Sequence, residues 1–124
     1  MATDLAHARA RYALERVQRW NWPRETVQLV KGLPVSVRTL GLAQAVALLA
    51  RREAAARDLA EDLCGWLLRE APAKPLGAGS ADPGALLDKI AKSSPGQTRA
   101  AEQEALRFLE VLKLFGEAKY GTGG

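Results

Sequence analysis

The sequence predicts an all-α fold, a single-domain bundle of five or six helices. Ala and Leu supply 23 and 19 of the 124 residues, whereas Val, Ile and Thr together supply 13. Ala and Leu are strong helix formers and β-branched residues favour strands, so this balance argues against an all-β fold. Apolar residues also recur at spacings of three and four, and the chain has the length of one domain.

The first half of the chain is divided by Pro and Gly into four expected helical segments, over residues 3–20, 24–31, 33–40 and 42–52. Pro23 disfavours helical geometry at Trp22 and so separates the first two segments. We expect Gly32-Leu33-Pro34 to end the second and Gly41 to separate the third from the fourth. The first helix has an apolar stripe formed by Ala6, Ala10, Ala13, Val17 and Trp20.

The second half contains a helix over residues 54–70, a short helix over 85–92 and a long final helix. Residues 71–84 hold three Pro and three Gly, which predicts an exposed, mobile loop. Ser94, Pro95 and Gln97 form a capping box with Pro at the first helical position, so the final helix starts there and runs to about Tyr120. The domain therefore covers residues 1–120, and we expect residues 121–124 to be a disordered tail.

Residues for catalysis or metal binding are sparse. Cys64 and His7 are the only Cys and His, which excludes an internal disulfide and a zinc site of Cys and His. The glycine motifs of nucleotide-binding loops are missing, as are a signal peptide and an apolar run of the ~18 residues that a membrane span needs. We expect a cytoplasmic protein that is not an enzyme and that uses no cofactor and no metal.

Acidic and aromatic residues also receive structural interpretations. Acidic neighbours such as Glu61-Asp62 and Glu102/Glu104 do not face each other on a helix, so we interpret them as solvated faces. Each of the three tryptophans lies on or beside an apolar stripe and is interpreted as a core residue.

Basic residues gather in the first half of the chain. Residues 1–57 hold ten Lys and Arg against four Asp and Glu, whereas residues 58–124 hold eight against ten. Such a half suggests a polyanionic partner, nucleic acid above all; a solvated basic face is the alternative. The candidate nucleic-acid contacts are Arg9, Arg16, Arg19, Lys31, Arg38, Arg51 and Arg52.

The final helix is apolar on more than one side. Leu106 and Leu114 lie away from its core stripe, which is formed by Ala101, Ala105, Phe108, Leu112 and Phe115. A helix apolar on two sides is usually buried on two sides. We therefore expect an interface with a second copy or another subunit; two isolated exposed leucines are the alternative. The candidate interface residues are Leu106, Glu110 and Lys113.

Motifs along most of the chain resemble those of one known family. Lys31-Gly32-Leu33-Pro34 is followed by Gly41-Leu42-Ala43-Gln44-Ala45, which enters an apolar helix. Trp66-Leu67 is similar to the end of that family's middle helix, and residues 104–115 are similar to its final helix. The family is the small all-helical subunit of the type III-B CRISPR RNA-guided effector, the Cmr complex.

The resemblance implies a non-catalytic structural subunit that acts in antiviral defence. Its partners would be the other subunits of the type III-B effector, copies of itself by stacking, and the guide RNA and target RNA. The basic residues named above would then contact the RNA backbone. Two alternatives stay open: a helical DNA-binding regulator that reads the major groove, and a protein–protein adaptor with no nucleic-acid role.

Overall fold

Six α-helices and one π-helical turn make up the fold in the computed structural model, which describes residues 4–121 and contains no strand among them. The all-α prediction is confirmed. The expected helical start at Thr3 and tail residues 122–124 lie outside the described residues. The elements are α1 Leu5–Gln18, α2 Pro23–Leu40, α3 Leu42–Ala50, α4 Ala55–Gly65, the π-helical turn η1 Trp66–Glu70, α5 Pro83–Ala91 and α6 Pro95–Tyr120.

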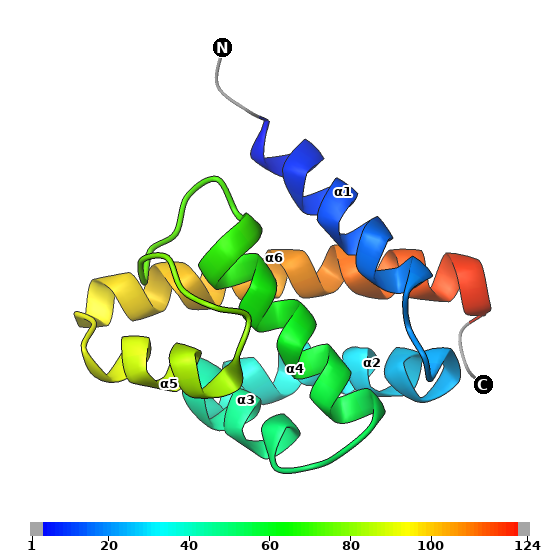
Figure 1. The fold of residues 1–124 in the computed structure, drawn as a ribbon, viewed down its shortest axis with the longest axis horizontal. Helices are drawn as coiled ribbons and strands as arrows, with labels where there is room; N and C mark the ends of the chain where they lie inside the picture. The colour runs from blue at the N-terminus through cyan, green and yellow to red at the C-terminus, as the bar shows by residue number, and fades with distance from the viewer. Residues whose placement is uncertain (1–3, 122–124) are drawn as a thin grey trace.

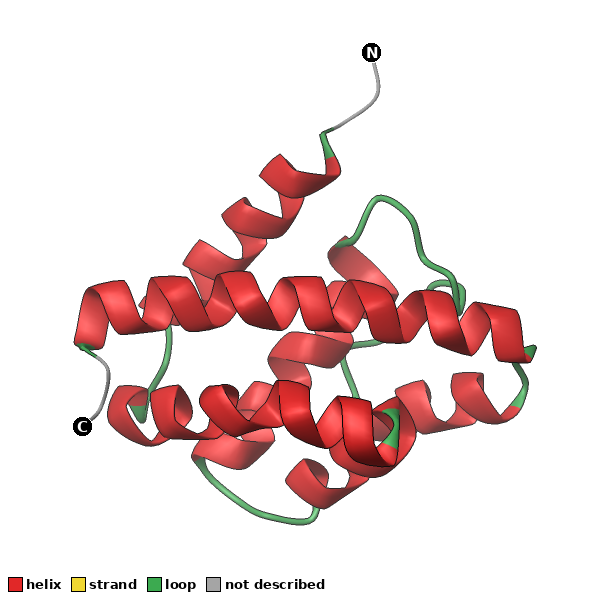
Figure 2. Ribbon diagram, turned by 180° about the vertical axis from the view of Figure 1, so that it is seen from behind, coloured by secondary structure: helices red, strands yellow, loops and turns green. Residues whose placement is uncertain are grey.

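The long helix α6 runs along the longest axis of the molecule, and α1 and α2 both pack against it (Figure 1). Seen from behind, α2 and α6 lie side by side (Figure 2). They are antiparallel, because Gly41 at the end of α2 lies beside Glu102 near the start of α6, whereas Val27 lies beside Gly116 near its end. α3 and α4 pack against α2, and α5 packs against α3 and α4.

The structure corrects the predicted break in the middle of α2. The helix continues from Pro23 to Leu40 with Pro34 inside it, where two separate helices were expected. A proline inside a helix costs ~3 kcal/mol because it lacks the N–H that would bond to the preceding turn. Here the apolar side of α2 is buried without interruption on both sides of the proline, which offsets that cost: its residues are Val27, Val30, Leu33, Pro34 and Val37.

The predicted separation at Gly41 is confirmed. Gly41 has φ 89°, a conformation that side-chain-bearing residues rarely adopt, and it links α2 directly to α3. The Leu42 N–H at the start of α3 has no partner within that helix, and it donates instead to Glu102 Oε2 of α6 at 2.9 Å. This contact fixes the corner between α2 and α3 to the first turns of α6.

The second half agrees with the predicted segments. The helix expected over residues 54–70 is present as α4 followed by η1, and the final helix opens with the predicted capping box at Ser94 and Gln97. The loop predicted over residues 71–84 is observed over 71–82, because α5 starts at Pro83, and it is anchored as well as exposed. Leu76 is buried, and the Gly79 N–H donates to the Leu68 carbonyl at 2.8 Å. The mobility of this loop stays a prediction.

Two buried carboxylates fasten α1 to the rest of the bundle. Glu104 of α6 accepts two hydrogen bonds from Arg9, at 2.7 and 2.8 Å, and one from the Trp66 indole N–H at 2.9 Å. Asp62 of α4 accepts from Arg16 at 2.6 Å and from the Trp20 indole N–H at 2.9 Å. The expectation that these acidic residues are solvated is therefore wrong for both Asp62 and Glu104.

The reason that sequence spacing missed these carboxylates is that their partners come from other helices. Glu104 and Asp62 face arginines and indoles distant in the sequence, not their own acidic neighbours. The arginine and indole donors together reach both oxygens of each carboxylate, so burial leaves no unsatisfied oxygen. The buried side of α1 also differs from the predicted stripe, because Ala6 is exposed and Tyr12 is buried. The Tyr12 ring stacks on Trp66 with 5.9 Å between the ring centroids.

Substituting Glu104→Gln should strongly destabilise the chain. The change leaves the Arg9 guanidinium buried without a counter-charge, which typically costs ~3–5 kcal/mol. The matched control is Glu70→Gln, because Glu70 pairs with Arg69 at the surface and exposed pairs are worth ~0–1 kcal/mol. Urea denaturation measures both free energies of unfolding. Equal, small effects of the two variants would contradict the role given to Glu104.

Candidate nucleic-acid interface

The structure divides the seven predicted basic residues between the interior and the surface. Arg9 is buried against Glu104, and the guanidinium of Arg16 is half-buried against Asp62. Both are engaged by counter-charges of the protein itself, so neither presents a net positive charge to a phosphate. Exposed positions are occupied by Arg19, Arg38, Arg51 and Arg52, and Lys31 is half-exposed.

Burial and pairing act in opposite directions on these internal charges. Burial raises the pKa of Asp62 to about 6, although the charge of Arg16 and the hydrogen bonds from Trp20 and Arg16 favour its ionised form. The hydrogen bond to Glu104 raises the pKa of Arg9, so its guanidinium stays charged. At neutral pH the Asp62 carboxylate is therefore largely ionised and neutralises Arg16 inside the protein.

Four exposed or half-exposed positions on α2 form one continuous row. Residues 24, 31, 35 and 38 are spaced by seven, four and three, so they share one side of the helix. Arg24 and Arg38 are exposed, Val35 is 60% exposed, and the row contains no Asp or Glu. Lys31 and Arg38 are thus brought together as the sequence predicted, with Arg24 added.

A groove of about 400 Å³ lies between α2 and the end of α3. Its walls are apolar over much of their length, with Leu29 and Leu33 on α2 and Leu48 and Leu49 on α3. Arg51 and Arg52 line the groove at the C-terminal end of α3, where the helix dipole favours cations. We call the surface formed by Arg24, Lys31, Val35, Arg38, Arg51 and Arg52 the α2 face.

The remaining predicted residue, Arg19, lies apart from these groups. It ends α1 and is exposed at the turn that leads into α2. The sequence therefore grouped Arg9, Arg16 and Arg19 on one flank of α1, but the structure keeps only Arg19 of the three at the surface. Helical periodicity could not show that Arg9 and Arg16 are internal, because their ion-pair partners Glu104 and Asp62 lie on other helices.

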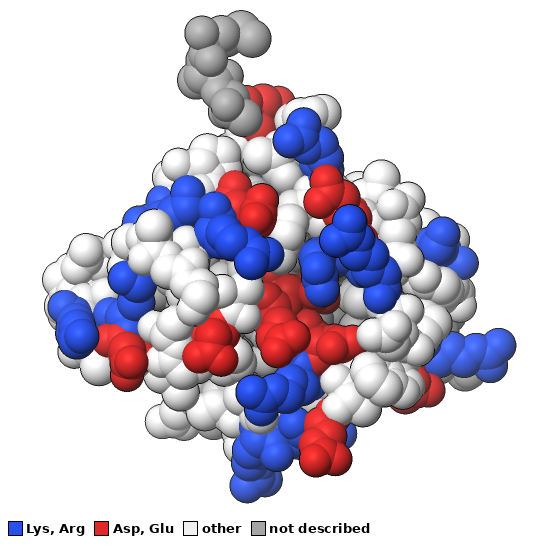
Figure 3. All heavy atoms as spheres, in the orientation of Figure 1, with Lys and Arg blue, Asp and Glu red and all other residues white. Residues whose placement is uncertain are grey.

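The opposite side of the molecule is mixed in charge. In Figure 3 the Asp and Glu spheres gather at the centre, over α4, with Lys and Arg spheres around them. Asp58 and Glu61 of α4 are both half-exposed and contribute to this acidic centre. The side that carries α1 and α4 therefore offers no continuous basic surface.

The candidate interface residues on α6 lie beside the α2 face. Leu106 and Lys113 belong to the row 102, 106, 109, 113 and 116, which faces α2 because Glu102 contacts Leu42 and Gly116 contacts Val27. Both are half-exposed, and Leu106 packs partly against the core. Glu110 is exposed, and Leu114 is 61% exposed. Leu106 and Lys113 thus adjoin the α2 face, whereas Glu110 and Leu114 lie further around α6.

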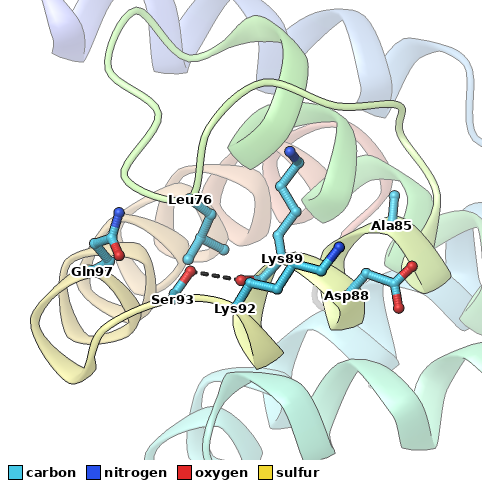
Figure 4. A pocket seen from close by; sticks show the side chains of 7 residues that line it. All are labelled: Leu76, Ala85, Asp88, Lys89, Lys92, Ser93 and Gln97. Atoms are coloured by element: carbon cyan, nitrogen blue, oxygen red, sulfur yellow. Dashed lines mark hydrogen bonds between the residues drawn. The ribbon is translucent and has the colours of Figure 1, made fainter.

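A second hollow, of about 360 Å³, lies between the 71–82 loop, α5 and the start of α6 (Figure 4). Its polar groups hold the loop and the helix ends together. The Ser93 hydroxyl donates to the Lys89 carbonyl at 2.6 Å, and the Gln97 amide donates to the Pro75 carbonyl at 3.3 Å. These bonds account for the Ser93 and Gln97 side chains without a ligand.

Within residues 4–121, no group of three or more His, Cys, Asp and Glu is arranged to hold a metal ion. Cys64 is fully buried in α4, and burial raises the pKa of its thiol to about 12, so it is a poor nucleophile. His7 is exposed on α1. No helix in this part of the chain is both long and apolar enough to span a membrane.

Comparison with known families decides the identity. Residues 5–119 match the sequence profile described as CRISPR-associated protein (Cas_Cmr5). The chain belongs to the Cas_Cmr5 family. As a Cas_Cmr5 protein it is the small subunit of the type III-B Cmr complex, and the resemblance found in the sequence is confirmed. Its association with other Cmr subunits and a part in CRISPR antiviral defence follow from the family.

A solved structure agrees with this assignment. The crystal structure of a CRISPR-associated Cmr5 family protein from Thermus thermophilus superposes with a TM-score of 0.77 at 26% sequence identity. The match covers 94% of this chain and 97% of that chain. No curated protein sequence is significantly similar to this Cas_Cmr5 chain.

Proposed function

We propose that this Cmr subunit is non-catalytic and binds the guide RNA or the target RNA through the α2 face. The observation that carries the proposal is the position of four basic residues: Lys31 and Arg38 belong to one row on α2, and Arg51 and Arg52 line the groove between α2 and the end of α3. The row on α2 adds Arg24 and contains no acidic residue that would repel phosphate.

The chemistry of this face suits the RNA backbone. The planar guanidinium of Arg donates a fork of hydrogen bonds that matches two phosphate oxygens, and Lys supplies a point charge. Contacts to phosphate carry no sequence information, so binding should be insensitive to sequence. It should weaken steeply with salt, because neutralised phosphates release their counterions.

Replacing Arg51 and Arg52 together by Ala should weaken RNA binding and its salt dependence. Two lost phosphate contacts reduce the slope of log K against log salt by about 1.4, since each contributes about 0.7 on a single strand. The matched control is Lys89→Ala with Lys92→Ala, which removes the same charge from α5. Fluorescence anisotropy with a labelled single-stranded RNA at several salt concentrations measures both variants.

The outcomes separate the three candidate functions. A reduced slope for the arginine pair and an unchanged slope for the lysine pair support the α2 face. Equal effects of the two pairs would mean non-specific attraction to net charge. No RNA binding by the unsubstituted chain would favour a protein–protein adaptor, and a preference for one duplex DNA sequence would favour a DNA-binding regulator.

We also propose that Leu106, Glu110, Lys113 and Leu114 of α6 contact a neighbouring copy or another Cmr subunit. Leu114 supports this, because it is a leucine exposed at 61%, and Leu106, about two turns earlier on α6, is half-exposed. Leu106 and Lys113 adjoin the α2 face, so a subunit that stacks there would continue along the same RNA.

The interface is tested best at Leu114, because Leu106 packs partly against the core and a charge there would also affect folding. Leu114→Asp should leave the melting temperature unchanged but reduce the amount of the chain that co-purifies with the assembled effector. Leu14→Asp is the matched control, since Leu14 is an exposed leucine on α1. Full incorporation of Leu114→Asp would overturn the proposed interface.

A further inference from the structure

Trp22 lies at the surface, contrary to the sequence-based interpretation of all three tryptophans as core residues. Trp66 and Trp20 are buried, whereas Trp22 is 42% exposed. Within residues 4–121 it is the one exposed side chain among Phe, Tyr and Trp. An indole that is 42% exposed offers part of a large apolar ring to a partner.

The turn between α1 and α2 holds the backbone of Trp22 in one conformation. Its carbonyl accepts two hydrogen bonds from Thr26, one from the backbone N–H at 2.9 Å and one from the hydroxyl at 2.8 Å. Thr26 itself is fully buried. On the other side of the turn, Trp20 is fixed by its bond to Asp62 and by stacking on Tyr120 at 6.2 Å. The backbone that bears the exposed Trp22 ring is therefore held in place by hydrogen bonds.

Basic residues surround this turn. Arg19 precedes Trp22 by three residues, Arg24 follows it by two, and both are exposed. Lys119 is near the same place, because it lies 5.8 Å from the ring of Tyr120, which stacks on Trp20. Lys and Arg spheres project at the right edge of Figure 3, where Figure 1 has this turn and the end of α6. Glu25, also exposed, sits in the first turn of α2, where the helix dipole favours a carboxylate.

We propose that Trp22 stacks on the base of an unpaired nucleotide at one end of the α2 face. An aromatic ring beside cations is the usual means of holding single-stranded nucleic acid, because every base has a face that stacks and every nucleotide has a phosphate. Arg24 belongs to the same row as Lys31 and Arg38, so a backbone that follows this row reaches the turn. The proposal rests on the proposed function and adds a contact of a different physical kind.

The salt dependence of binding distinguishes a stacking contact from a phosphate contact. Stacking releases no counterions, whereas phosphate contacts do. Trp22→Ala should therefore lower the affinity for a labelled oligoadenylate of about 15 nucleotides by about 5- to 100-fold, without changing the slope of log K against log salt. Leu14→Ala, which shortens an exposed apolar side chain on α1, should leave the affinity unchanged.

Two further measurements separate stacking from a structural effect. Trp22→Phe keeps an aromatic ring and should retain most of the affinity, and both Trp22→Phe and Trp22→Ala should be fully folded at the temperature of the binding assay. On a blunt duplex RNA without unpaired nucleotides, Trp22→Ala should bind as tightly as the unsubstituted chain.

Each outcome decides one question. If Trp22→Ala binds the oligoadenylate normally while the Arg51/Arg52 pair still weakens binding, the stacking proposal fails and the RNA-binding function stands. If neither change affects binding, both proposals fail. If Trp22→Ala binds RNA normally but no longer enters the assembled effector, Trp22 contacts a protein subunit instead.

Discussion

Two carboxylates buried inside the bundle determine where the first helix lies, and the exposed surfaces depend on that placement. Glu104 and Asp62 each accept hydrogen bonds from one arginine of α1 and one indole. Arg9 and Arg16 are seven residues apart and so face the same side of α1. A buried ion pair adds little net stability over an apolar pair, but its loss leaves a charge without a partner. The two pairs therefore specify the position of α1 more than they strengthen the fold.

This placement decides which charges remain for a partner. With Arg9 and Arg16 neutralised internally, only Arg19 of the three arginines predicted on the flank of α1 stays at the surface. The Trp20 indole is buried and donates to Asp62, whereas Trp22 is exposed in the short turn that follows. The helix α2 then starts at Pro23. Of the seven predicted basic residues, those that stay at the surface lie along α2 and at the end of α3, with Arg19 at the turn before α2.

The sequence predicted the helical elements well because their signals are local. The capping box at Ser94, the corner at Gly41 and the proline at the start of α2 act through neighbouring residues. Pro34 was misread because its local cost is offset by burial against distant helices. The same limit applies to the site: Lys31 and Arg38 could be grouped by their spacing, whereas the partners of Arg9 and Arg16 are 95 and 46 residues away in the chain. The exposure of Trp22 likewise depends on which of two nearby indoles reaches Asp62.

The central claim is that RNA meets this Cmr subunit on the α2 face and not along α1. The most direct measurement is site-specific photocrosslinking in the assembled effector, with a benzophenone side chain placed at Val35 or, separately, at Leu14. Both positions are exposed, so neither substitution should disturb the core. The account predicts RNA crosslinks from position 35 and none from position 14. Crosslinks from position 14 with none from position 35 would contradict it.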